Sequence, residues 1–129
     1  MNKEERVKIQ FFTDLNGWKE AHKLVIIIYK ITKEFPREEV YGLTNQMRRA
    51  AVSITSNIAE GFSRQSYAEK AQFYSIAQGS NTELQNQILV AKDVGYLDEK
   101  VFNEISNQLV IVHKLLNGLI KKSKFIHNS

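Results

Sequence analysis

Residues 102–119 read FNEISNQLVIVHKLLNGL, and the spacing of their apolar side chains decides the fold. Large apolar residues recur at alternating intervals of three and four along this stretch: Phe102, Ile105, Leu109, Val112, Leu116 and Leu119. This heptad spacing is typical of a helix that packs one side against another helix. Asp98 stands just before it, in the position of an N-cap residue. The pattern therefore predicts a helix over residues 98–122, with a frayed chain beyond Lys122.

Similar periodicity predicts three more helices, over residues 15–33, 41–62 and 66–94. The first of them ends before Pro36, because proline disfavours the helical conformation in the residue that precedes it. The links between the four helices are short, so consecutive helices run antiparallel. The sequence therefore predicts an all-α fold, an antiparallel up-down-up-down four-helix bundle that forms a single domain over residues 1–129.

Polar residues mark the expected helix ends. Asp14 or Asn16 is predicted to cap the first helix. Ser66 and Glu69 have the S-x-x-E spacing of a capping box at the start of the third helix. Gly95 follows that helix, where a residue in the left-handed conformation closes many helices.

Small side chains are concentrated in the helix over 41–62, which indicates that it is the central helix of the bundle. They are Ala50, Ala51, Ser53, Ser56, Ala59 and Gly61. In the helix over 66–94, Gly79 costs about 1 kcal/mol relative to alanine, and its presence predicts a close helix crossing there.

Composition excludes several classes of protein. There is no cysteine, which excludes disulfides, thiolate zinc sites and cysteine nucleophiles. The charged start of the chain predicts no secretory signal, and no apolar run approaches the ~20 residues of a membrane span. We therefore expect a cytoplasmic protein that does not bind a membrane.

Catalytic motifs are also missing. No glutamate has a histidine three residues later, the three histidines are isolated, and no phosphate-binding loop or nucleophile elbow is present. We predict no catalytic residue, no metal site and no cofactor, and hence a protein that is not an enzyme.

The first and last helices carry more apolar side chains than one bundle core requires. The additional residues are Leu24, Ile26, Ile27, Tyr29 and Ile31 in the first helix, and Val110, Ile111, Leu115 and Ile120 in the last. A helix that is apolar nearly all round has to be covered on more than one side, which predicts a homo-oligomer. The alternative is that some of these residues are simply exposed.

The net charge is +4, and residues 113–129 hold four lysines and no acid. Basic side chains that face away from the apolar seam are candidate contacts for the phosphates of RNA or DNA. They are Lys19, Lys23, Arg48, Lys114, Lys121, Lys122 and Lys124. For the C-terminal lysines, the alternative interpretation is that they complement the dipole of the last helix.

Polar residues border the apolar stripes of the second and third helices. They are Gln46, Arg49, Ser53, Asn57, Glu60 and Arg64 in the second, and Ser80, Glu83 and Gln87 in the third. An ion pair of Arg49 with Glu60 or Glu83 would satisfy the charges. We interpret the stripe as a structural polar network that fixes helix register or a subunit interface, with a binding or catalytic groove as the alternative.

Several motifs match one known family. They are Trp18-x-x-Ala21, Tyr29, Phe35-Pro36, Tyr41-Gly42-Leu43, Gln46-x-Arg48-Arg49-Ala50, Ser53-Ile54-x-x-Asn57-Ile58-Ala59-Glu60-Gly61, Arg64, Phe73, Ala77-x-Gly79-Ser80-x-x-Glu83, Gln87 and Gly95-Tyr96. In these the chain resembles the four-helix-bundle proteins of 23S rRNA intervening sequences, over about residues 11–120. That group is similar to the accessory variability determinants of diversity-generating retroelements.

The resemblance implies a homopentameric, barrel-shaped assembly. In the retroelement proteins it also implies binding of nucleic acid and of a reverse transcriptase, whereas no activity is implied for the intervening-sequence proteins. The present chain lacks the strongly basic composition of the retroelement proteins.

Three hypotheses follow. The first is a non-enzymatic oligomeric scaffold that binds structured RNA or DNA through basic surface residues. The alternative is a protein–protein adapter that docks a helix of a partner on an apolar face of the bundle. The least favoured is an enzyme that uses Arg49, Glu60 and Glu83.

Overall fold

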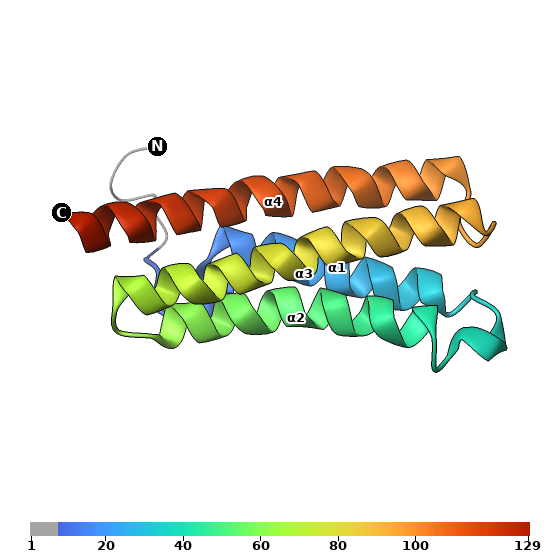
Figure 1. The fold of residues 1–129 in the computed structure, drawn as a ribbon, viewed down its shortest axis with the longest axis horizontal. Coiled ribbons are helices and arrows are strands. Elements are labelled where there is room, and N and C mark those ends of the chain that lie inside the picture. The colour runs from blue at the N-terminus through green and yellow to red at the C-terminus, as the bar shows by residue number, and fades with distance from the viewer. Residues whose placement is uncertain (1–7) are drawn as a thin grey trace.

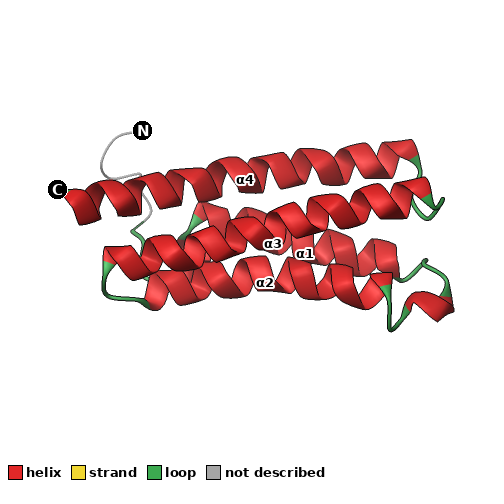
Figure 2. Cartoon of the chain, viewed as in Figure 1, coloured by secondary structure: helices red, strands yellow, loops and turns green. Residues whose placement is uncertain are grey.

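The computed structural model describes residues 8–129 as four long antiparallel helices (Figures 1 and 2). They are α1 (Asn16–Thr32), α2 (Leu43–Ser63), α3 (Tyr67–Asp93) and α4 (Glu99–Asn128). Short 3₁₀ turns lie at Phe12–Asp14 and Arg37–Glu39, and the described part of the chain contains no strand. The all-helical four-helix prediction is confirmed.

The order of packing follows the short connections. α2 packs against α1 and α3, and α4 packs against α3 and α1, so the first and last helices are neighbours in space. The seam between the four helices contains the largest side chains that water does not reach: Leu24, Ile28, Met47, Ile54, Ile58, Leu84, Ile88, Ile105, Leu109, Val112 and Leu116. The predicted heptad residues of α4 thus supply a large part of the core.

Three of the predicted helix ends are confirmed. Ser66 Oγ accepts a hydrogen bond from the Glu69 amide at 3.1 Å, which is the Ser66 half of the predicted capping box. Asp98 Oδ1 accepts a hydrogen bond from the Val101 amide at 2.8 Å. Gly95 has a φ of +89°, the left-handed conformation in which glycine is least strained.

The prediction that Asp14 or Asn16 caps α1 is wrong. The residue before the helix is Leu15, which offers no side-chain acceptor. Asp14 instead turns back, and its Oδ2 accepts the amides of Gln10 and Phe11 at 3.0 and 3.1 Å. These hydrogen bonds lower the pKa of Asp14 and fix the 3₁₀ turn that precedes α1.

The start of α2 lies two residues later than predicted. Glu39 Oε1 accepts the Leu43 amide at 3.2 Å, while Glu39 Oε2 accepts the Tyr96 hydroxyl at 2.7 Å. The Tyr96 hydroxyl and then the Leu43 amide lower the pKa of Glu39, because both stabilise its charged form. One carboxylate therefore ties the start of α2 to the turn between α3 and α4.

Fraying beyond Lys122 was predicted incorrectly, since α4 continues to Asn128. Ser123 is buried, and its hydroxyl donates to the Leu119 carbonyl at 2.8 Å. The last turns of α4 stay helical because this residue still lies against the body of the bundle.

A buried amide joins α3 to α4. Asn81 is almost fully buried, and its Nδ2 donates to the backbone carbonyl of Leu109 at 3.2 Å. This hydrogen bond sits among apolar side chains and aligns the two helices along their length.

The apolar excess of the first and last helices is partly absorbed by the core. Leu24 is completely buried, which corrects its assignment to the outer surface, and Ile27 and Ile31 pack partly against the core. Ile26 and Tyr29 on α1, and Val110 and Ile111 on α4, remain exposed. Leu115 and Ile120 are half-buried. Across residues 8–129, no helix is long and apolar enough to span a bilayer.

The close helix contact expected at Gly79 lies instead at Gly61. A Cβ atom on Gly79 would meet no atom within 4 Å, whereas one on Gly61 would lie 2.6 and 2.9 Å from two ring atoms of Tyr74. Tyr74 is buried, so its ring has little room to move, and burial raises the pKa of its hydroxyl. At Gly61 of α2, therefore, the Tyr74 ring of α3 leaves no room for a side chain.

Two glycine-to-alanine variants test this packing. Gly61→Ala should destabilise the protein by about 1–3 kcal/mol, because the added methyl group overlaps the Tyr74 ring. Gly79→Ala should stabilise it by about 0.5–1 kcal/mol, because alanine is the better helix former and the site is open. Urea unfolding followed by circular dichroism measures both, and equal effects of the two substitutions would contradict the assignment.

Candidate nucleic-acid interface

Basic side chains are unevenly divided between the helices. α1 and α4 carry eight lysines, Lys19, Lys23, Lys30, Lys100, Lys114, Lys121, Lys122 and Lys124, against three acids, Glu20, Glu99 and Glu104. α2 and α3 carry four bases, Arg48, Arg49, Lys70 and Lys92, against four acids, Glu60, Glu69, Glu83 and Asp93. Because α1 and α4 are neighbours, the positive excess belongs to one half of the bundle.

The lysines of α1 form a row on its outer side. Lys19, Lys23 and Lys30 are separated by four and seven residues, which places them on one face of the helix, and all three are exposed. Lys23 Nζ lies 2.8 Å from Glu20 Oε2, and this lysine is the largest cause of the lowered pKa of Glu20. Lys30 was not among the residues predicted from the sequence, although its spacing of seven residues from Lys23 indicates that it lies on the same face.

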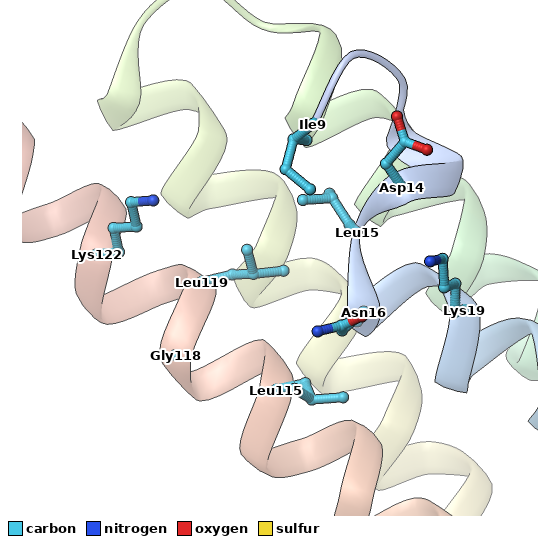
Figure 3. A pocket seen from close by; sticks show the side chains of 10 residues that line it. Ile9, Asp14, Leu15, Asn16, Lys19, Leu115, Gly118, Leu119 and Lys122 are labelled. Atoms are coloured by element: carbon cyan, nitrogen blue, oxygen red, sulfur yellow. The ribbon is translucent and has the colours of Figure 1, made fainter. Parts of the chain in front are cut away.

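Two predicted lysines from distant parts of the chain line the same hollow (Figure 3). Lys19 of α1 and Lys122 of α4 line opposite sides of a space of about 600 Å³. Its apolar wall includes Leu15, Leu115 and Leu119. The antiparallel packing of α1 on α4 therefore brings together cations that the sequence placed near its two ends.

The other predicted lysines of α4 are all exposed. Lys114 and Lys121 are seven residues apart and lie on the same face, while Lys124 follows in the last turns of the helix. In the described residues the ion pairs are Glu20–Lys23 and Glu60–Arg64, so these lysines have no carboxylate partner there.

Arg48 lies apart from these lysines and is engaged within the chain. Its guanidinium carbon is 4.6 Å from the centroid of the Tyr29 ring, and its Nε donates to Thr32 Oγ1 at 2.9 Å. Arg48 therefore ties α2 to the end of α1, and these contacts engage the guanidinium that was predicted to bind phosphates.

Three further bases are also held by contacts within the chain. Lys70 Nζ donates to the carbonyls of Gly61 and Phe62 at 3.3 and 2.7 Å, and burial lowers its pKa. Lys92 lies 4.5 Å from the centroid of Phe102, and Arg64 Nη2 is 3.0 Å from Glu60 Oε2. Arg48, Arg64, Lys70 and Lys92 thus serve the fold.

Within the polar stripe, one hydrogen bond joins α2 to α3 and the others lie within a single helix. Ser53 Oγ and Ser80 Oγ are 2.8 Å apart, and Asn57 Nδ2 donates to the Ser53 carbonyl at 2.8 Å. Gln87 Nε2 donates to Glu83 Oε1 at 3.1 Å.

The predicted pairing of Arg49 with Glu60 or Glu83 is wrong. Glu60 pairs with Arg64 one turn later, and Arg49 is exposed without a carboxylate partner in the described residues. Arg49 lines two shallow hollows, one with Gln46 and Glu83 and the other with Arg48. The three charged residues proposed as catalytic therefore do not form one cluster.

Metal-binding side chains are dispersed in this part of the chain. Over residues 8–129, no group of three or more histidine or carboxylate side chains is arranged to hold a metal ion.

An aromatic cluster at the start of α1 was not predicted from the sequence. The Trp18 and His22 rings are stacked, with centroids 4.7 Å apart and planes inclined by 11°. The Phe12 ring meets Trp18 edge-on at 5.6 Å. The i, i+4 spacing of Trp18 and His22 is the signal in the sequence, whereas the approach of Phe12 depends on the turn that Asp14 fixes.

The fold and its charge define a class of small helical bundle with one basic half. The chain matches the model of the 23S rRNA-intervening sequence protein family over residues 13–118, and it belongs to that family. A solved structure from Bacteroides thetaiotaomicron, described as a protein of unknown function from the S23 ribosomal protein family, is similar with a TM-score of 0.76. It shares 22% sequence identity, with 81% of this chain and 98% of that chain covered. No curated protein matches the chain.

The neighbouring arginines of α2 should differ in their effect on stability. Arg48→Ala should cost about 1–2 kcal/mol, because it removes the interaction with the Tyr29 ring and a hydrogen bond to Thr32. Arg49→Ala should change the free energy of unfolding by less than about 0.5 kcal/mol, since Arg49 is exposed and pairs with no carboxylate of residues 8–129. Chemical denaturation of both variants measures the difference, and a greater destabilisation by Arg49→Ala would refute this assignment.

Proposed function

We propose that the protein is a non-enzymatic, self-associating helical scaffold that binds the phosphate backbone of structured RNA or DNA. The supporting observation is a set of exposed lysines that have no carboxylate partner in the described residues: Lys19 and Lys30 on α1, and Lys114, Lys121, Lys122 and Lys124 on α4. Cations that are free of carboxylate partners release counterions from a nucleic acid when they bind its phosphates, and this is the main source of sequence-independent affinity. Structured RNA is the preferred target, in keeping with the family's name for an intervening sequence of 23S rRNA.

Self-association is the second part of the proposal. Ile26 and Tyr29 on α1, and Val110 and Ile111 on α4, are exposed apolar side chains on adjacent helices. Covering them with a second copy would remove apolar surface from water. We propose a homopentamer, the assembly implied by the resemblance to the accessory determinants of retroelements. A pentamer would also multiply the lysine rows available to one nucleic acid.

A protein–protein adapter is the alternative function. The observation that favours it is the exposure of Val110, Ile111 and Phe125 along α4, which offers apolar anchors to a helix of a partner protein. Such a partner would stay bound after nuclease treatment, whereas a nucleic acid would be lost.

Removal of lysines from α1 should weaken binding in a salt-dependent way. The double variant Lys19→Ala/Lys30→Ala should lower the slope of log affinity against log salt by about 2, because each lysine that is removed leaves one phosphate without its neutralising charge. Fluorescence anisotropy with an RNA duplex and a DNA duplex of equal length measures this slope from ~50 mM salt upward.

Lys92→Ala is the control, because it removes a positive charge on α3 that is already engaged within the chain, against the Phe102 ring of α4. It should leave the slope unchanged. Absence of binding at ~50 mM salt, or a slope near zero for the unaltered protein, would refute binding through phosphates.

Light scattering on the purified protein tests the assembly. We expect a mass of about five chains, and an increased ratio of absorbance at 260 to that at 280 nm if nucleic acid co-purifies. Ile26→Lys/Ile111→Lys should reduce the mass, since charged side chains would then stand in the proposed interface. A stable single chain at micromolar concentration would refute self-association.

A further inference from the structure

The aromatic cluster at the start of α1 presents ring surface to solvent. Phe11 is 66% exposed and Phe12 37% exposed, and His22 is also exposed. Trp18 packs partly against the core, and the Phe12 and His22 rings contact it. Exposed rings that lie together at one place are a feature of binding surfaces.

The position of the rings is fixed before any ligand arrives. His22 stacks on Trp18 one helical turn earlier, and Phe12 is held against Trp18 by the 3₁₀ turn that packs on α1 and α2. Asp14 secures that turn through the amides of Gln10 and Phe11. A ligand that stacks here therefore loses little binding energy to ordering of the protein.

Cations flank the rings. Lys19 and Lys23 directly follow Trp18 and His22 along α1, so each is displaced by about 100° around the helix axis from its neighbour. The nearby carboxylates are engaged within the chain, Asp14 by two backbone amides and Glu20 by Lys23 and Gln108. Lys19 thus supplies an unpaired positive charge beside the rings, whereas the charge of Lys23 is paired with Glu20.

This combination is the chemistry of single-stranded nucleic acid. Exposed bases stack on aromatic side chains, while the phosphates beside them are held by cations. A purely apolar protein partner would gain nothing from the lysines, and a duplex would keep its base faces covered. The pattern therefore favours unpaired nucleotides.

We propose that Phe12, Trp18 and His22, with the exposed Phe11 next to Phe12 in the sequence, form a stacking platform for unpaired bases of RNA or DNA, with Lys19 on the adjoining phosphates. This inference rests on the proposed function, because Lys19 is also among the lysines that supply the backbone contacts. It deepens that function by assigning single-stranded segments, such as loops, to one end of α1.

Trp18 provides a direct probe, because it is the sole tryptophan of the chain. Titration of the full-length protein with an oligothymidylate of about twelve nucleotides should quench its fluorescence. An abasic oligodeoxynucleotide of equal length has the same phosphates but no bases, and should bind at least about fivefold more weakly without quenching.

His22→Ala should abolish most of this preference for bases, since it removes an exposed ring without disturbing the core. Phe11→Ala should also reduce it, and circular dichroism checks that both variants fold. His113→Ala, which removes an exposed histidine on α4, is the matched control and should keep the preference.

The outcomes separate the two proposals. Equal binding of the thymidylate and abasic oligomers would overturn the platform while leaving the phosphate contacts intact. An undiminished preference in both His22→Ala and Phe11→Ala would also overturn it. Failure of both oligomers and the duplexes to bind at ~50 mM salt would overturn the proposed function itself.

Discussion

The close approach of α2 to α3 is the constraint on which the rest of the bundle depends. Gly61 leaves space for the buried Tyr74 ring, and small residues elsewhere along the contact, such as Ala50 and Ala77, are also buried. Because these helices lie so near one another, Ser53 and Ser80 can share a hydrogen bond at the margin of the seam. The remaining apolar volume is completed by larger side chains from α1 and α4.

The topology brings lysines that lie far apart in the sequence onto one half of the bundle. α1 and α4 stand far apart in sequence, yet an up-down-up-down order makes them neighbours. Their lysines therefore lie on the same half of the bundle. Arg48, Lys70 and Lys92, in contrast, make contacts that hold the helices together. The number of bases in the sequence does not reveal this division. The division depends on which basic side chains make contacts within the folded chain.

Periodicity was sufficient to predict the four helices and their antiparallel order, since both follow from apolar spacing and short links. Caps that act within a few residues, at Ser66, Gly95 and Asp98, were predictable for the same reason. Glu39 could not be assigned, because its carboxylate bridges two parts of the chain that meet in three dimensions. Helix ends are thus predictable where their chemistry is local.

The candidate site was less predictable than the fold. Exposure of Lys19, Lys23 and the α4 lysines followed from helical geometry. The partners of Arg48 and Arg49 could not be predicted in this way. A long side chain can reach several neighbours, and which of them are near is known only from the folded structure. The approach of Phe12 to Trp18 was hidden for a similar reason, since it requires the turn before α1 to fold back on the helix.

Asn81 has a consequence for how many structures this sequence can adopt. Apolar helices tolerate sliding past one another, because one leucine can replace another in the same gap. A displacement of α3 along α4 would break the hydrogen bond from Asn81 Nδ2 to the Leu109 carbonyl, and the buried Asn81 Oδ1 already has no hydrogen-bond partner in the described residues. Losing the partner of a buried polar group costs about 1–3 kcal/mol. This cost favours the observed alignment of α3 and α4 over displaced ones with nearly equal apolar burial.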